Sequence, residues 1–292
     1  MSINFSRLFC TAKCTRWLAG VLSLGLVASL SAQADGLDDV RQKGRLRVAV
    51  YNDFPPYSFD GKGIDVDIGK ALADRLGVKA EISWFNADED MNDDLRNMVW
   101  KGHYLGTQPA DVMLHVPLDK HLAAQNDKVK IFAPYHVEAL AMARVPALVP
   151  EPAGSAAVAF NVFTREKVGV EIASGSDGFL LSVLNGRLRE NVVHYRTVPL
   201  AAAGLKSGEI AAIMAPRAEL ESALKRDQAY PVNALKMLEL RSDQWALAMA
   251  VKAEDSTLAE ALTAALIALQ KDGTVARIFN DYLITHQSPG SL

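Results

Sequence analysis

Short apolar runs alternate with amphipathic stretches along most of this chain, and the alternation predicts strands separated by helices. A helix is expected where Ile68, Leu72 and Leu76 recur at intervals of four and Gly77 follows. A second helix should end at Gly102. Because helices cross over between the strands, the strands should be parallel. The predicted strands are residues 46–50, 80–85 and 111–116.

The alternation resumes after a stretch with three prolines at 145–152, which predicts an extended surface connection. Near the C-terminus, Thr257 and Glu260 form a capping-box pattern that should open a helix closed at Gly273, and a last short helix should follow. These patterns together predict an α/β fold. The further predicted strands are 139–143, 168–172, 192–195 and 210–214, and the further helices are 177–188 and 200–207.

The first 34 residues have the pattern of a secretory signal peptide. Three basic residues precede an uncharged apolar run over residues 17–30, which is shorter than the roughly 20 residues needed to span a bilayer. Residues 32–34 read Ala-Gln-Ala, the small-x-small pattern of a cleavage site. We therefore expect cleavage after Ala34 and export to the periplasm.

The mature protein should begin at Asp35 and be soluble. Both cysteines, Cys10 and Cys14, lie in the removed segment, so no disulfide, metal thiolate or lipid anchor is expected. Removing three basic residues and no acidic one changes the formal charge from −3 to −6, which argues against a nucleic-acid partner. The remaining length suits one large domain or two modest ones.

Aromatic residues crowd the stretch directly after the first predicted strand, at positions 51–59. Aromatic side chains at this place either complete a hydrophobic core or line a cleft. We expect Phe59 to fill a hydrophobic corner and Phe54 to face a cleft.

Three segments together resemble the type II periplasmic solute-binding proteins, specifically family 3, which includes the polar amino-acid receptors of ABC transporters. Residues 46–77 resemble the strand, aromatic loop and "G-x-D-V-D-I" helix of that family, and residues 206–214 and 257–283 resemble two later motifs. The resemblance implies two α/β lobes joined by two crossing hinge strands that close on a ligand. It implies a discontinuous lobe 1 and a continuous lobe 2. Lobe 1 would be 35–140 plus 245–292, and lobe 2 would be 141–244.

The resemblance also suggests where a ligand would bind. The loop after the first strand would form one wall of the cleft. In lobe 2, residues 174–178 lie between a strand and a helix, where free N–H groups and hydroxyls can bind an anion or a polar group, with Asp177 as the N-cap. For His115 a core position, and for Arg217 and Gln244 a surface or hinge contact, remain alternatives. The expected ligand-binding residues are Tyr51, Phe54, Tyr57, His115, Asp119, Lys120, Ser174, Ser176, Arg217 and Gln244.

Two positions depart from the amino-acid receptors. Those receptors hold the ligand carboxylate with an arginine after the third strand and the ammonium group with an aspartate after a strand of lobe 2. Here residues 114–121 contain no arginine and residues 211–217 no aspartate. Lysine and histidine cannot reproduce the planar fork of arginine. We therefore expect a small organic ligand other than a standard amino acid.

Metal and catalytic sites are not expected. Asp88, Asp90, Asn92 and Asp94 have the alternating spacing of the first calcium ligands of an EF-hand, but Asp93 stands where that loop needs glycine and the closing glutamate is missing. An acidic helix start is the favoured interpretation. The histidines show no metal-binding spacing, and no cofactor is predicted.

The favoured function is a monomeric solute-binding protein without catalysis that serves an ABC transporter permease or a periplasmic quinoprotein dehydrogenase. The second partner is suggested because residues 90–119 resemble the solute-binding-like proteins that accompany quinoprotein alcohol dehydrogenases. Two alternatives remain open. One is a dehydratase of the cyclohexadienyl type with Glu171 as general acid. The other is an accessory protein of such a dehydrogenase that has no transport role.

Overall fold

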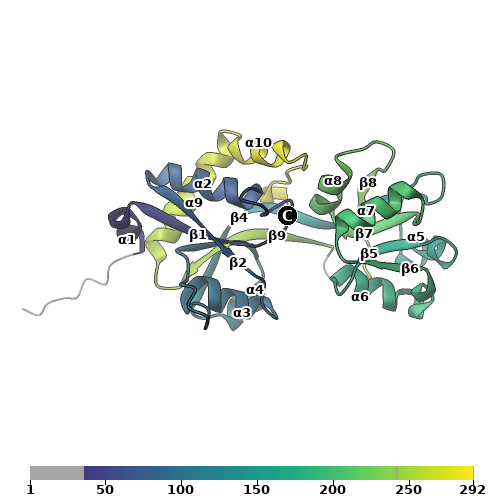
Figure 1. The fold of residues 1–292 in the computed structure, drawn as a ribbon, viewed down its shortest axis with the longest axis horizontal. Helices are drawn as coiled ribbons and strands as arrows, with labels where there is room; N and C mark the ends of the chain where they lie inside the picture. Colours follow the sequence, from purple (N-terminus) through teal and green to yellow (C-terminus); the bar gives the residue numbers. More distant parts are fainter. Residues whose placement is uncertain (1–35, 241–242, 292) are drawn as a thin grey trace, which may run out of the picture. The chain divides into compact units, whose positions relative to one another are not determined.

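The computed structural model describes residues 36–240 and 243–291 (Figure 1). The predicted signal peptide lies outside these residues. Within the two ranges, none of the helices combines the length and the apolar character needed to cross a bilayer.

The first part of the sheet contains the strands predicted near the N-terminus. Strand β1 (Arg45–Tyr51) lies between β2 (Lys79–Phe85) and β3 (Val112–Pro117) and pairs with both in parallel, as the helical crossovers predicted. The carboxyl ends of the three strands therefore share one edge of the sheet. The full strand order is β2-β1-β3-β9-β4-β7-β5-β6, with β8 beside β4.

Two long strands continue the sheet. Strand β4 (Val129–Arg144) pairs antiparallel with β9 (Gln244–Lys252) along its first part and with β7 along residues 140–144. The sequence predicted only the end of β4, because its ladder is interrupted between Phe132 and His136. Strand β4 thus belongs to both parts of the molecule.

The second part of the sheet is also largely parallel. Strand β7 (Ala212–Pro216) pairs in parallel with β5 (Val168–Glu171), which pairs in parallel with β6 (Val192–Tyr195). The short β8 (Val232–Ala234) runs antiparallel to β4. The carboxyl ends of β5, β6 and β7 therefore form a second shared edge.

Helices cover both parts of the sheet. In Figure 1, α2, α9 and α10 lie on one side of the first part and α3 and α4 on the other, while α7 and α8 lie opposite α6 in the second part. The helices are α1 (Gly36–Lys43), α2 (Ile64–Leu76), α3 (Met91–Leu95), α4 (Lys120–Gln125), α5 (Ala156–Ala159), α6 (Gly175–Ser182), α7 (Val198–Ser207), α8 (Arg217–Leu224), α9 (Ser256–Lys271) and α10 (Thr274–Asp281).

Each part has its own hydrophobic core. Side chains of β1, β3, α2 and α9 pack together in the first, and side chains of β5, β7 and α7 pack in the second. We call the first part lobe 1 and the second part lobe 2. The boundaries proposed from the sequence, at residues 140 and 245, stay a prediction.

Three predicted elements need correction. The helix predicted over 177–188 ends at Ser182, because Leu184 and Asn185 adopt left-handed backbone angles with φ of 52° and 57°. The helix near the C-terminus begins at Ser256, so Thr257 lies inside its first turn and is not its cap. Strand β7 begins two residues later than predicted.

The C-terminal segment contacts elements of both lobes. The N–H of Thr285 donates to the carboxylate of Glu221 in α8 at 2.6 Å. Two residues further, the carbonyl of Gln287 accepts the N–H of Val137 in β4 at 3.0 Å. After α10 the chain therefore contacts a helix of lobe 2 at Thr285 and then the hinge strand β4 at Gln287.

Candidate functional site

Four ring side chains meet at the carboxyl ends of β1 and β3. Phe54 and Tyr57 stack with ring centroids 5.7 Å apart. His115 stands edge-on to both, 4.9 Å from Phe54 and 4.3 Å from Tyr57. Tyr51 touches the edge of Phe54 at 6.0 Å. We call these four residues the aromatic cluster. The structure thus brings together four of the residues predicted for the site.

The loop that carries Phe54 and Tyr57 is fixed by its own backbone. The N–H of Phe54 donates to the carbonyl of Ser58 at 2.6 Å, which closes a tight turn. The chain then enters α2 at Gly63, which has a φ of 137°. A Cβ at this position would lie 2.1 Å from the carbonyl oxygen of Tyr57. Only glycine fits here, because it alone tolerates both the angle and the close approach.

The two tyrosine hydroxyls of the aromatic cluster already have partners. Tyr51 donates to Asp94 at 2.6 Å, and Tyr57 donates to Glu138 at 2.7 Å. Both side chains are buried, and burial raises the pKa of each hydroxyl. These residues therefore offer no free hydroxyl, and their buried rings pack against Phe54 and His115.

His115 is held by a buried carboxylate. Its backbone has a φ of 63°, and its N–H donates to the hydroxyl of Tyr135 at 3.1 Å. Its Nδ1 lies 3.1 Å from Oδ2 of Asp65, and Tyr135 donates to Oδ1 of the same carboxylate at 2.7 Å. Asp65 is fully buried. The network fixes the orientation of the imidazole ring against the aromatic cluster.

Glu138 connects the two lobes. It lies on the shared strand β4 and is 2 % exposed. Its carboxylate accepts the hydroxyl of Tyr57 from lobe 1 and the N–H groups of Arg217 and Ala218, at 3.1 Å and 3.3 Å, from the first turn of α8 in lobe 2. Burial raises the pKa of this carboxyl, and the hydrogen bonds act against the rise. Sequence reasoning missed Glu138, although a single charge in an apolar strand was a signal.

Two more glutamates lie at the carboxyl edge of lobe 2. Glu171 ends β5, and its carboxylate accepts the N–H of Val198 at the start of α7 at 3.2 Å. Burial raises its pKa. Glu219 lies half-buried in the first turn of α8. Burial, together with Glu171 and Glu138 nearby, raises the pKa of Glu219 to about 8.

The turn before α6 differs from the prediction. Ser174 and not Asp177 is the N-cap, and its Oγ accepts the N–H of Asp177 at 3.2 Å. The carboxylate of Asp177 instead accepts the N–H of Ala173 at 2.9 Å and lies 3.0 Å from Nε2 of His194. Ser176 is buried. A carboxylate of the protein itself therefore lies at the N-terminal end of α6, bonded to the N–H of the residue that precedes the N-cap.

The other predicted residues have structural contacts of their own. Nη2 of Arg217 donates to the carbonyl of Val137 and to that of Thr285, each at 3.4 Å, which turns the guanidinium toward the C-terminal segment. Asp119 caps α4, and Lys120 and Gln244 are exposed. The structure does not join these three residues to the aromatic cluster through any contact within the described ranges.

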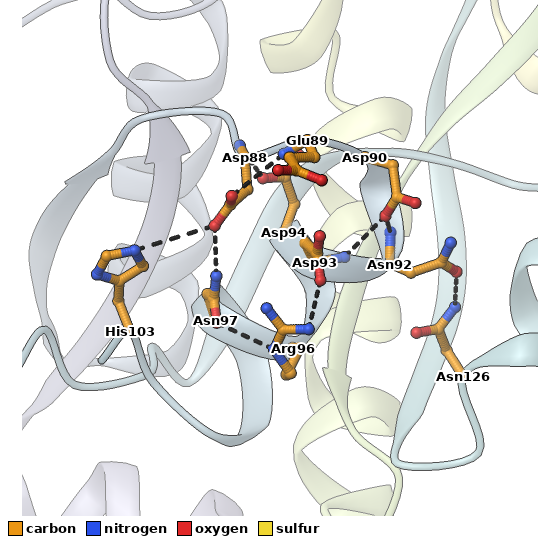
Figure 2. Close-up of polar contacts among 10 residues, drawn as sticks. All are labelled: Asp88, Glu89, Asp90, Asn92, Asp93, Asp94, Arg96, Asn97, His103 and Asn126. Carbon is orange, nitrogen blue, oxygen red and sulfur yellow. Dashed lines mark hydrogen bonds and ion pairs between the residues drawn. The ribbon is translucent and has the colours of Figure 1, made fainter. Parts of the chain in front are cut away.

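The acidic segment before α3 organises the chain locally (Figure 2). Asp90 caps α3 by accepting the N–H of Asn92 at 2.8 Å, as an acidic helix start predicts. Asp88 accepts the side-chain amide of Asn97 at 2.7 Å, and Asp94 accepts the N–H of Asp88 at 2.7 Å. Among the residues that the structure describes, no three potential ligands are grouped so that they could hold a metal ion.

Comparison with known proteins identifies the family. The family model of the bacterial extracellular solute-binding proteins, family 3, matches residues 46–285. The chain belongs to this family. Members of family 3 bind small molecules and work with ABC transporters, and in bacteria they are periplasmic. The resemblance inferred from the sequence is confirmed at this level, and the quinoprotein subgroup stays a prediction.

The relatives of this family 3 protein include a binding protein and an enzyme. The L-cystine-binding protein TcyJ of Escherichia coli (strain K12) is 26% identical over 271 residues, which cover 88% of this chain and 91% of the relative. Cyclohexadienyl dehydratase of Pseudomonas aeruginosa is 37% identical over 89 residues, which cover only 28% of this chain and 33% of the dehydratase.

Solved structures confirm the two-lobed periplasmic binding protein fold. An ancestral cationic amino acid solute-binding protein superposes with a TM-score of 0.64 at 21% identity, covering 85% of this chain and 99% of that one. An amino acid ABC transporter substrate-binding protein from Streptococcus pneumoniae bound to L-arginine superposes with a TM-score of 0.57 at 19% identity, covering 87% and 100%. At these identities the likeness shows the fold alone.

Proposed function

We propose that this family 3 protein binds a small organic ligand other than a standard amino acid between its lobes and delivers it to an ABC transporter permease. The observation that carries the proposal is the position of Glu138. This carboxylate accepts hydrogen bonds from Tyr57 in lobe 1 and from Arg217 and Ala218 in lobe 2, directly beside the aromatic cluster. A ligand bound at this junction would contact both lobes and stabilise their closed arrangement.

Phe54 is our candidate for apolar contact with the ligand. Its ring is half-buried, and its hydrophobic packing partners belong to lobe 1. Ser176 and the backbone around Ser174 would supply polar contacts from lobe 2. The remaining expected contacts are Tyr51, Tyr57, His115, Asp119, Lys120, Arg217 and Gln244.

Two sequence differences from the amino-acid receptors support a ligand other than an amino acid. Strand β3 ends in Val116 and Pro117, and no arginine follows it before α4. The position after β7 is Arg217, whose guanidinium is directed at the carbonyl of Thr285. Neither the carboxylate nor the ammonium group of an amino acid would therefore find its usual partner.

Two measurements test the proposed binding function. Mass spectrometry of the undenatured protein, purified without denaturant, should detect a small molecule that leaves on unfolding. After that molecule is removed and added back, solution scattering should give a smaller radius of gyration with it than without it. A bound molecule that leaves the radius unchanged would argue for the accessory protein of a dehydrogenase.

We also propose that the mature protein is periplasmic and begins at Asp35. N-terminal sequencing of the exported protein tests this directly. A mature protein that retains Cys10 with an attached lipid would contradict it.

The dehydratase remains the second candidate because of Glu171. Burial raises the pKa of its carboxyl, as a general acid requires, and the short match to cyclohexadienyl dehydratase favours the same reading. The hydrogen bond from Val198 acts in the opposite direction, since it stabilises the ionised form. Conversion of the co-purified molecule during incubation with the protein would establish the enzyme.

A further inference from the structure

Three carboxyl groups converge at the lobe 2 edge of the proposed site. Strand β7 lies between β4 and β5 in the sheet, and its last residue, Pro216, pairs with Leu140 of β4. Glu138 therefore lies just beyond the end of β7, Glu171 ends the neighbouring β5, and Glu219 follows in the first turn of α8. The raised pKa of Glu219 reflects this proximity, because both other carboxyls contribute to it.

Among the residues that the structure describes, two of these carboxyls have no cationic partner. The positive charge of Arg217 acts on Glu138, and Arg217 also pairs with Glu221, with Nε and Oε1 3.8 Å apart. Glu171 receives only the N–H of Val198. Within residues 36–240 and 243–291, no hydrogen bond or ion pair is found for the carboxylate of Glu219. A positively charged ligand group would displace the proton of Glu219 and supply the missing partner.

The same region is poorly suited to a ligand anion. The carboxylate of Asp177 lies at the N-terminal end of α6, where it accepts the N–H of Ala173, and its negative charge would repel a ligand anion there. The arginine fork of the amino-acid receptors is missing after β3. A ligand carboxylate would therefore meet negative charge at α6 and no arginine in lobe 1.

Phe54, the half-buried phenylalanine of the aromatic cluster, adds a ring surface that suits a cation. Tyr57 joins this cluster to Glu138 through its hydroxyl, so the rings and the carboxyl edge are neighbours. Aromatic faces attract ammonium and guanidinium groups, and the attraction grows when water is excluded. The ring of Phe54 on one side and carboxylates on the other would enclose a cationic group.

We propose that the ligand is an organic amine or guanidine that carries no carboxylate, and that Glu219 and Glu171 hold its positive group. This inference rests on the proposed binding function, because it names the class of ligand for the same site. It also gives Glu219 and Glu171 a role in ligand specificity. The sequence had not predicted Glu219 as a site residue.

Calorimetry with matched pairs of compounds tests the inference. Cadaverine is lysine without its carboxylate, and agmatine is arginine without its carboxylate. The ligand-free protein should bind at least one of the two amines about tenfold more tightly, or better, than the matching amino acid. Equal or tighter binding of the amino acids would overturn the inference, and so would the absence of binding by both amines at millimolar concentration.

Variants identify the carboxylates involved. Glu219→Gln and Glu171→Gln keep the shape of the side chain and should each weaken amine binding about tenfold or more. The matched control is Glu190→Gln, an exposed glutamate near β6, which should bind as the unchanged protein does. Melting temperatures establish that the variants are folded. Unchanged amine binding in both Glu219→Gln and Glu171→Gln would contradict the proposal.

The outcomes separate this inference from the binding function. If a neutral or anionic co-purified molecule makes the protein more compact, the ligand class is wrong and the binding function stands. If no bound molecule makes the protein more compact, the binding function itself fails.

Discussion

Phe54 offers the simplest test at the scale of one residue. Phe54→Ala should weaken ligand binding by about 1.5–3 kcal/mol if the ligand covers the ring, because that is the transfer free energy of a buried aromatic side chain. The melting temperature should fall less than for a fully buried phenylalanine, since Phe54 is half-buried. Calorimetry with the co-purified ligand and thermal unfolding measure the two effects.

Phe59→Ala is the control for Phe54→Ala. Phe59 lies in the same loop, is also half-buried and has the ammonium group of Lys62 over its ring, 5.2 Å from the centroid. Its removal should leave binding unchanged. If Phe54→Ala lowers the melting temperature sharply and the folded protein binds normally, Phe54 is a core residue.

Glu219 should make stability depend on pH. Its pKa is about 8 in the folded chain, whereas the ordinary value is 4.5. Between these values the folded protein holds a proton that the unfolded chain has lost, so the free energy of unfolding should fall as the pH rises from about 4.5 to about 8. Glu219→Gln should flatten this dependence, which urea unfolding at several pH values can measure.

The comparison variant for the pH experiment is again Glu190→Gln, which should retain the slope of the unchanged protein. Glu138 and Glu171 also have raised pKa values and contribute in the same direction. Some slope should therefore remain after Glu219 is replaced. An identical slope with and without Glu219 would contradict the assignment.

Single residues show what the sequence could and could not predict about the site. The aromatic cluster was accessible, because Tyr51, Phe54 and Tyr57 follow one predicted strand and His115 ends a neighbouring one. Glu138 and Glu219 were missed, because each is a single acidic residue and the carboxyls near it come from segments far away in the chain. Only the pairing of β4 with β7 brings these two carboxyls together.

At the scale of elements, Glu138 couples strand β4 to the loop after β1 and to helix α8. Glu138→Gln should lower the free energy of unfolding by about 1–3 kcal/mol, because a buried, multiply bonded carboxylate is replaced by an amide that cannot satisfy all its donors. Tyr57→Phe removes one of those donors and should cost less. Urea unfolding of both variants and of the double variant measures the coupling.

The double variant decides whether the hydrogen bond matters. If the hydroxyl and the carboxylate interact as the 2.7 Å distance indicates, the loss in the double variant should be smaller than the sum of the single losses. Simple additivity would show that the bond contributes nothing measurable.

Elements with a regular hydrophobic repeat were predictable, and irregular ones were not. Helix α2 ends at Gly77 as predicted, where glycine adopts a φ of 73°. The end of α6 was missed, because apolar residues continue at helical spacing while the backbone leaves the helix at Val183, which has a ψ of 150°. The first part of β4 was missed, because Ala133, with a φ of 48°, lies within the break in its ladder.

At the scale of the whole molecule, the ligand class is the decisive property. Calorimetric titration with each of the twenty standard amino acids should show weak binding or none, because the carboxylate and the ammonium group would each lose charge-assisted hydrogen bonds worth about 1.5–3 kcal/mol. The co-purified ligand serves as the positive control. A micromolar response to any standard amino acid would contradict the proposal.

The path of the C-terminal segment has a practical consequence for watching this protein at work. Because Thr285 is bonded to Glu221 in α8 and Gln287 to Val137 in the hinge strand, the last residues link α8 of lobe 2 to the hinge. When the two lobes move relative to each other, the hydrogen bonds of Thr285 and Gln287 must shift or break. A fluorescent label near residue 288 would therefore sense the opening of the joint itself, and a bulky C-terminal fusion would change the motion that it was meant to report.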